Sequence, residues 1–161
     1  MRRLLSLLVF VTLTGCKPFI TLRAFRLGSA PTLHDAEEYE VKGEYDRAIT
    51  AYRMHIHNRL KAKDRPEGEN PYFYHLKIGD IELKRGQIDK ALEEYEFAER
   101  NGVEAGLIAD RYRQVGRTYE ERRDLKGAIG LLERYRDRDP LLFDAILDRL
   151  AKDLVKKEEQ K

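Results

Sequence analysis

The stretch GDIELKRGQIDKALEEYEFAER, residues 79–100, decides the fold of this chain. It carries two small residues, Gly79 and Ala91, on either side of Gly86. A glycine such as Gly86 is typical of the point where a helix stops and the chain turns. Small side chains on the flanking segments let two helices approach closely, with larger residues packed around them. The stretch therefore predicts a helical hairpin.

The same arrangement occurs three times along the chain. A first copy has Ala36 and Ala48 around Gly43, and a third has Gly116 and Ala128. The second small residue recurs after 43 residues between the first two copies and after 37 residues between the last two. Self-similarity at such a spacing is the signature of a repeat architecture.

These residues resemble tetratricopeptide repeats over roughly residues 29–142. That family has a period of about 34 residues, so each offset includes a short insertion between repeats. Its small positions are matched by Ala36, Gly79, Gly116, Ala48, Ala91 and Ala128. Glu82 departs from the aromatic residue that Tyr39 and Tyr119 supply at the same position. The resemblance implies an all-α, TPR-like solenoid of three helical hairpins.

Helix-capping signals support this register independently. A side-chain acceptor before a first helical turn, often with a proline in that turn, is typical of a helix N-terminus. Such signals occur at Thr32 with Asp35, at Asn70-Pro71 and at Asp139-Pro140. The polar segment KAKDRPEGEN, residues 61–70, contains Pro66 and Gly68 and predicts a lengthened loop between the first two hairpins.

The segment after Pro140 predicts one further helix. Its apolar residues follow a single helical stripe, at Phe143, Ile146, Leu147, Leu150 and Leu154. We expect a capping helix from Pro140 to about Val155, because solenoids need a polar outer cap. The expected organisation is a helical domain over residues 32–155 and a flexible tail over residues 156–161.

The first residues, MRRLLSLLVFVTLTGC, have the layout of an export signal. Arg2 and Arg3 precede an apolar run from Leu4 to Leu13, and small residues precede Cys16. The run is roughly half the 20 or so apolar residues that a transmembrane helix needs. We therefore expect a signal peptide over residues 1–15 that is removed.

The end of this signal, Leu13-Thr14-Gly15-Cys16, resembles the lipobox of bacterial lipoproteins. The resemblance implies cleavage before Cys16 and a diacylglyceryl thioether, usually with an N-acyl chain such as palmitate, on that residue. Lipidation also explains a lone cysteine in an exported chain. Two or three acyl chains, at about 0.8 kcal/mol per buried methylene, anchor a protein stably. Residues 16–31 are expected to form a tether; the alternative is an ordinary signal ending near a free cysteine.

The balance of charges argues against nucleic-acid binding. The chain has 161 residues, with 31 basic and 29 acidic side chains, and loss of Arg2 and Arg3 with the signal leaves 29 of each. Binding to phosphates needs a concentrated basic face, which a balanced chain does not supply. We expect one folded unit that does not bind nucleic acid.

No motif predicts catalysis, a cofactor or a metal site. His55 and His57 are two residues apart, so on a helix they point in nearly opposite directions and cannot share a metal ion. We expect one of the two at an interface between repeats and the other in solvent. Ser29 is the one serine after the signal, which argues against a serine hydrolase. The sequence predicts a protein that is not an enzyme.

The resemblance implies a binding groove lined by the first helix of each repeat. Transferred position by position, the groove residues are Leu33, Glu37, Glu40 and Val41, then Phe73, Leu76, Asp80, Leu83 and Lys84, then Asp110, Arg113, Arg117, Glu120 and Glu121. Arg113 and Arg117 lie one turn apart, where they could grip an acidic side chain or a C-terminal carboxylate. The alternative is that both are ordinary exposed charges.

The expected function is a protein-protein interaction scaffold, or adaptor, in the bacterial cell envelope, anchored through Cys16. Lys17 after the cysteine resembles lipoproteins of the outer membrane, so the domain would face the periplasm. The alternative is a pilotin-like assembly chaperone for an outer-membrane secretin or pilus system. Members of that class usually have more repeats.

Overall fold

A computed structural model describes residues 31–159, and in this range the chain is helical and contains no strand. The all-α class predicted from the sequence is confirmed. The elements are α1 (Leu33–Val41), α2 (Tyr45–Lys61), the short 3₁₀ helix η1 (Pro71–Phe73), α3 (Tyr74–Lys84), α4 (Ile88–Arg100), α5 (Ala105–Glu121), α6 (Leu125–Arg134), the 3₁₀ helix η2 (Arg136–Arg138) and α7 (Pro140–Glu159).

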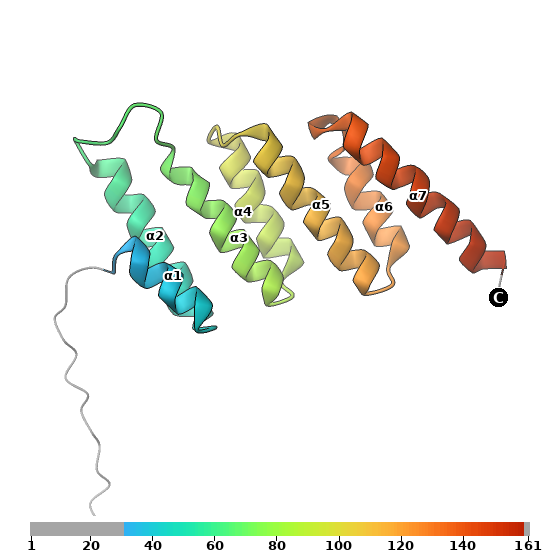
Figure 1. Cartoon of the computed structure of the whole chain (residues 1–161), viewed down its shortest axis with the longest axis horizontal. Coiled ribbons are helices and arrows are strands. Elements are labelled where there is room, and N and C mark those ends of the chain that lie inside the picture. The colour runs from blue at the N-terminus through green and yellow to red at the C-terminus, as the bar shows by residue number, and fades with distance from the viewer. Residues whose placement is uncertain (1–30, 160–161) are drawn as a thin grey trace, which may run out of the picture.

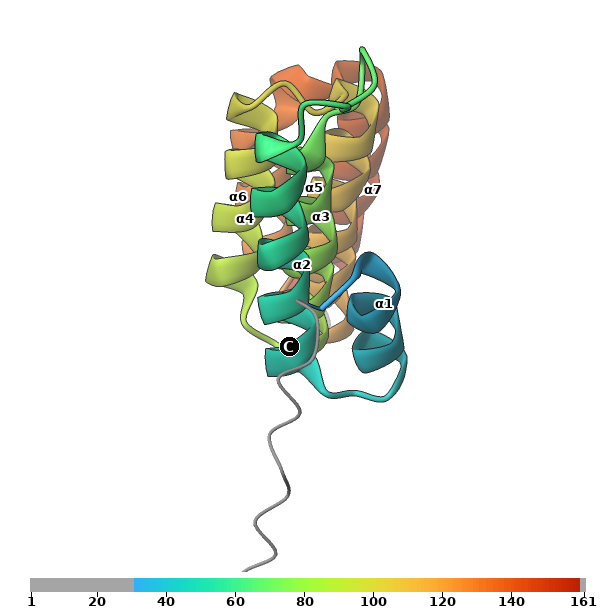
Figure 2. The ribbon, with the colours of Figure 1, turned by 90° about the vertical axis from the view of Figure 1, so that its left-hand side faces the viewer.

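The helices form a row of hairpins (Figure 1). Helix α1 packs on α2, α3 on α4 and α5 on α6, and each pair also contacts the next pair along the chain. Helix α7 packs on α6 and η2. Seen along the row, α1, α3, α5 and α7 form one layer and α2, α4 and α6 form the other (Figure 2). The predicted loop is observed between α2 and α3.

One type of turn closes all three hairpins. Gly43, Gly86 and Arg123 occupy equivalent places with φ of 72°, 78° and 60°. At each turn the N–H of the next residue donates to a carbonyl five residues back, in the pairs Glu44 to Tyr39, Gln87 to Glu82 and Asp124 to Tyr119, each 2.9 Å. This is the hydrogen bond that ends a helix in a Schellman motif. The two glycines were predicted as turn residues, whereas Arg123 was not.

The predicted N-terminal caps are confirmed. The backbone N–H of Thr32 donates to a carboxylate oxygen of Asp35 at 2.7 Å, and the hydroxyl of Thr32 accepts from the N–H of Asp35 at 3.3 Å. At the other two caps, Asn70 accepts the N–H of Tyr72 at 3.0 Å and Asp139 accepts the N–H of Leu142 at 3.1 Å. Each cap uses a backbone donor that the helix itself leaves unpaired.

The small residues lie where the two helices of a hairpin meet. A Cβ added to Gly79 would lie 2.7 Å from Cδ1 of Tyr95 on the partner helix, and one added to Gly116 would lie 3.2 Å from Cδ2 of Leu132. The four alanines at the other small positions, Ala36, Ala48, Ala91 and Ala128, are fully buried. Close approach at these positions is therefore observed as predicted.

Two apolar clusters form the core. The smaller one joins α1 and α2 to Ile78 and Ile81 of α3. The larger one extends from α3 to α7 and includes the fully buried Tyr95, Phe143 and Leu150. Helix α7 therefore closes the last hairpin with apolar contacts.

Helix α7 is longer than the sequence indicated. It continues to Glu159, so residues 156–159, predicted as part of a flexible tail, are helical. The i,i+4 spacing of basic and acidic side chains near its end, such as Arg149 with Asp153, is compatible with this extension. The predicted signal peptide, Cys16 and the tether up to residue 30 lie outside the described residues. None of the described helices is long and apolar enough to cross a membrane.

Candidate functional site

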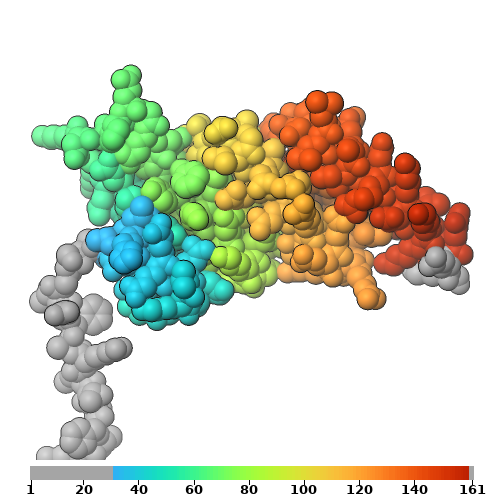
Figure 3. Space-filling view, in the orientation of Figure 1, coloured from blue at the N-terminus to red at the C-terminus, as the bar shows by residue number. Residues whose placement is uncertain are grey.

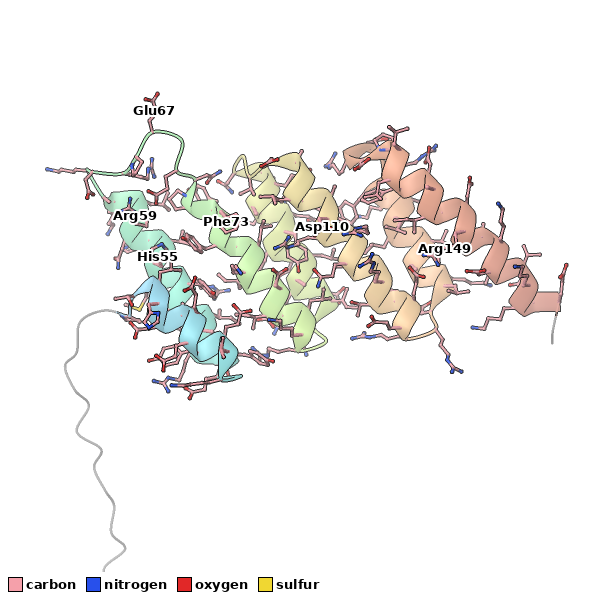
Figure 4. The ribbon with its side chains drawn as sticks, viewed as in Figure 1. His55, Arg59, Glu67, Phe73, Asp110 and Arg149 are labelled. Atoms are coloured by element: carbon pink, nitrogen blue, oxygen red, sulfur yellow. The ribbon has the colours of Figure 1, made fainter. Side chains whose placement is uncertain are left out.

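The predicted groove residues belong to the layer formed by α1, η1 with α3, α5 and α7. We call this surface the odd-helix face, and the opposite surface, formed by α2, α4 and α6, the even-helix face. Figure 3 shows the odd-helix face, with α1, α3, α5 and α7 lying side by side. Phe73, Asp110 and Arg149 mark its extent on η1, α5 and α7 (Figure 4).

Two predicted groove residues belong to the core instead. Leu76 is fully buried and Leu83 is buried, and both are part of the larger apolar cluster. Their prediction as groove residues was wrong. Both face into the interfaces of α3 with its neighbours, because α3 lies between α2, α4 and α5 and has few positions left for solvent.

Four of the nine predicted groove charges form ion pairs between neighbouring helices of the odd-helix face. Lys84 Nζ lies 2.6 Å from a carboxylate oxygen of Glu40, linking α3 to α1. The guanidinium of Arg111 binds both oxygens of Asp80 at 3.0 Å, linking α5 to α3. The guanidinium of Arg149 likewise binds both oxygens of Glu120, at 2.8 and 3.1 Å, linking α7 to α5. These residues keep the hairpins in register across the odd-helix face.

Buried tyrosines connect two of these pairs to the second layer. The hydroxyl of Tyr52 on α2 donates to Glu40 at 3.0 Å, and that of Tyr95 on α4 donates to Asp80 at 2.9 Å. Burial and the adjacent carboxylates raise the pKa of both tyrosines, so each hydroxyl stays a donor at neutral pH. Although burial opposes it, the hydrogen bonds from Lys84 and Tyr52 hold the pKa of Glu40 below its usual value. Glu40 is therefore an ionised, internally paired side chain.

The predicted arginine pair lies at a cavity between α5 and α7. This cavity, of about 280 Å³, is lined by Arg113, Arg117, Glu120, Leu142, Ile146 and Arg149, and we call it the arginine pocket. Arg113 forms an ion pair with Asp110, one turn earlier on α5. Arg117 is exposed, and it makes no ion pair or hydrogen bond with the described part of the chain. Its guanidinium is free to bind an anion.

Half of the arginine pocket was not predicted. Leu142, Ile146 and Arg149 all come from α7, which the sequence indicated as a cap only. Ile146 was recognised as part of the apolar stripe of that helix, but the stripe does not show that one of its members also faces a cavity. Arg111, the partner of Asp80, was also missed, because its position relative to α3 depends on how α5 packs.

The remaining predicted residues lie apart from the pocket. Glu37 and Glu121 are exposed on α1 and α5. Phe73 lines a second cavity, of about 410 Å³, with Tyr74, Val103 and Leu107 and the acidic residues Glu69 and Glu104. Glu69 is bound by Arg59 of α2. This cavity lies where η1 and α3 meet the connection from α4 to α5, and its lining is apolar and acidic.

One histidine of the pair His55 and His57 lies at an interface and the other in solvent, as expected. His55 packs edge-on against Tyr74 at 4.6 Å between α2 and α3, and burial together with Arg59 lowers its pKa. His57 is exposed. On the even-helix side, Nδ1 of His75 lies 2.5 Å from Glu94. Within residues 31–159, no three His, Cys, Asp or Glu side chains gather in a way that could hold a metal ion.

The chain matches no protein-family profile and has no significant match among curated proteins.

Proposed function

We propose that this protein is a lipid-anchored scaffold of the bacterial cell envelope, built as a TPR-like solenoid, that holds a partner protein on its odd-helix face. The observation that carries the proposal is the arginine pocket with its unpaired Arg117. Glu40, Asp80 and Glu120 on this face are used to join neighbouring helices, whereas this site combines a free guanidinium with an apolar floor. Such a combination suits binding of a peptide rather than a purely structural role.

The repeat geometry supports the solenoid part of the proposal. Each hairpin has small residues where its helices meet and ends its first helix in the same hydrogen-bonded turn. Hairpins that stack through equivalent contacts present a continuous surface of first helices, and repeat proteins use such surfaces for binding. The ion pairs from α1 to α3, α3 to α5 and α5 to α7 keep that surface in register.

The proposed envelope location depends on lipidation of Cys16 and is tested by replacing that residue. In bacteria that process lipoproteins, Cys16→Ser is expected to leave an uncleaved precursor that takes up no labelled palmitate, because the thioether cannot form. Gel mobility and palmitate labelling of the two proteins measure this. Normal processing of the variant would remove the lipoprotein assignment and leave the proposed binding face untouched.

The binding face is tested by site-specific photo-crosslinking in intact cells. A photo-reactive amino acid is placed at the exposed Glu37 or Glu121 on the odd-helix face, or at the exposed Lys90 or Glu133 on the even-helix face. We expect one discrete partner to be crosslinked from the first two sites and not from the last two. Mass spectrometry of the products identifies it.

The reverse pattern would contradict the proposal. If the even-helix sites alone gave crosslinks, the partner would bind the other layer. If all four sites gave the same weak smear of products, the domain would not hold a specific partner. Both outcomes are independent of the lipid anchor, because the Cys16→Ser test reports on it separately.

A further inference from the structure

The arginine pocket has two chemically different halves. Helix α5 supplies Arg113, Arg117 and Glu120, and α7 supplies Leu142, Ile146 and Arg149. Leu142 and Ile146 are partly exposed and pack against the larger core cluster, so the apolar floor rests on a fixed base. Basic groups and an apolar surface therefore meet within one small cavity.

The three arginines of the pocket differ in their availability. Arg149 is held by both oxygens of Glu120 and also lies 3.7 Å from Asp153. Arg113 has Asp110 as its partner. Arg117 has no partner among the described residues, so it is the group that gains most from an incoming anion. A guanidinium has five N–H donors, so Arg113 can also share an anion with Arg117 while it keeps Asp110.

The size of the cavity limits the ligand. Its volume of about 280 Å³ is at the lower end of the range of ligand pockets, about 300–1,000 Å³, which suits one or two amino-acid residues. The terminal residue of a peptide carries its carboxylate and its side chain on the same Cα. Both can therefore enter a small pocket together, the carboxylate at Arg117 and the side chain on Leu142 and Ile146. An internal aspartate or glutamate would bring a carboxylate without the apolar group.

We propose that the arginine pocket binds the C-terminal residue of a partner protein, with the free carboxylate on Arg117 and Arg113 and an aliphatic side chain on Leu142 and Ile146. This inference rests on the proposed function and specifies its ligand. It makes α7 half of the binding site in addition to the cover of the last hairpin. Glu120 limits the affinity, because its carboxylate occupies Arg149 and repels the ligand's carboxylate.

Fluorescence anisotropy with labelled glycine-serine decapeptides tests the ligand class. The purified domain that follows Cys16 is titrated with three peptides: one ending in leucine with a free carboxylate, the same peptide as its amide, and an amidated peptide with one internal aspartate. We expect the free acid to bind at least about tenfold more tightly than either amide. Equal binding of all three, or no binding of the free acid at about 1 mM, would overturn the proposal.

Variants then place the peptide in the pocket. Arg117→Ala is expected to weaken binding of the free acid about tenfold, whereas Lys90→Ala, which removes an exposed charge from the even-helix face, leaves it unchanged. Ile146→Ser removes part of the floor, and Leu141→Ser, at a position that is 89% exposed on the same helix, is its control. Melting curves check that each variant is folded. An unchanged affinity for folded Arg117→Ala would contradict the proposal.

One variant should improve binding, which misfolding cannot mimic. Glu120→Gln removes the negative charge beside the arginines and loosens its hold on Arg149, so the free acid is expected to bind about threefold more tightly. Weaker binding would show that Glu120 positions the ligand instead and would overturn the assigned role. If crosslinking finds a partner on the odd-helix face but Arg117→Ala does not reduce it, this inference fails while the proposed function stands.

Discussion

The two ends of the row of helices are stabilised in different ways. At the C-terminal end, α7 covers the last hairpin, and Phe143 and Leu150 are fully buried. At the other end, α1 and α2 belong to the smaller of the two apolar clusters. Exposed large apolar side chains occur at both ends, with Val41 and Leu60 at one and Leu141 and Val155 at the other. In a stack of hairpins, each unit depends on its own core and its nearest interface. We therefore expect the hairpin of α1 and α2 to open before the rest.

The junction between the first two hairpins is ionic, as is the next junction along the chain. Its long-range pairs are Glu40 with Lys84, Arg53 with Glu94, and Asp46 with Arg85. Partly exposed pairs contribute little free energy each, so they set the register more than they stabilise the contact. The comparison teaches that the end of the molecule covered by α7 also carries the arginine pocket, whose apolar residues pack on the larger cluster. A binding site gains from such a base because its groups stay in position.

We expect the largest effect on stability when a small, buried alanine in each apolar cluster is replaced by tryptophan. Ala91→Trp places a large ring in the fully buried interface of α3 and α4, and we expect it to destabilise the domain by at least about 3 kcal/mol. Ala36→Trp makes the same change in the first hairpin and should melt only α1 and α2. Thermal unfolding followed by circular dichroism separates the two results. If Ala91→Trp melted like the parent protein, the close approach of the helices would be refuted.

The same change, glycine to alanine, is expected to have opposite effects on stability at two positions. Gly79→Ala is expected to destabilise the domain by about 2 kcal/mol, because the fully buried ring of Tyr95 cannot move away from the new Cβ. Gly130→Ala on α6 meets no atom within 4 Å and should stabilise it by about 0.5–1 kcal/mol through helix propensity. Urea denaturation measures both. Stabilisation by Gly79→Ala would contradict the observed packing.

Replacement of Glu82 is expected to have a smaller effect, which stabilises the domain. This side chain is 7% exposed, and its Oε2 has no hydrogen-bond partner in the described structure, although a guanidinium nitrogen of Arg85 lies 3.8 Å away. The equivalent positions in the other two hairpins carry Tyr39 and Tyr119. Glu82→Met should stabilise the domain by about 1 kcal/mol, because it removes a buried, unsatisfied polar group. A lower denaturation midpoint for this variant would indicate that the ion pair with Arg85 outweighs the cost of burial.

Acid should weaken the ion pairs of the first junction. Although burial opposes it, hydrogen bonds from Lys84 and Tyr52 lower the pKa of Glu40, and those from His75 and Arg53 lower that of Glu94. A carboxyl whose folded pKa is depressed contributes stability above its unfolded pKa of about 4.5, and this is lost as pH falls further. We expect a small loss of stability below that pH. This loss should be smaller in Glu40→Gln and unchanged in Glu133→Gln. Denaturation curves at pH 7, 5 and 3 check this, and equal pH dependence of all three proteins would contradict it.

Features decided by neighbouring residues in the sequence could be predicted. The caps at Thr32 and Asn70, the turns at Gly43 and Gly86, and the helix after Pro140 all follow from local chemistry. The small positions were also recognised, because the pattern repeats.

Features decided by packing between hairpins could not be predicted. Position along a helix does not reveal that Leu76 is covered by its neighbours, or that Asp80 meets Arg111 of α5. Likewise, Arg123 adopts a positive φ without being glycine, because the turn is fixed by the helices on both sides. The arginine pair was foreseen at the sequence level, but its apolar floor on α7 required the fold.

Amide hydrogen exchange of the domain, measured with and without the peptide that ends in leucine with a free carboxylate, tests the contrast between the two ends most directly. In the free protein, amides of α1 and α2 should exchange faster than those of α3 to α7. Addition of the peptide should slow exchange in α5 and α7 and leave α1 and α2 unchanged. Protection confined to the first hairpin or to α2, α4 and α6, or slower exchange in α1 and α2 than in the rest of the free domain, would contradict this account.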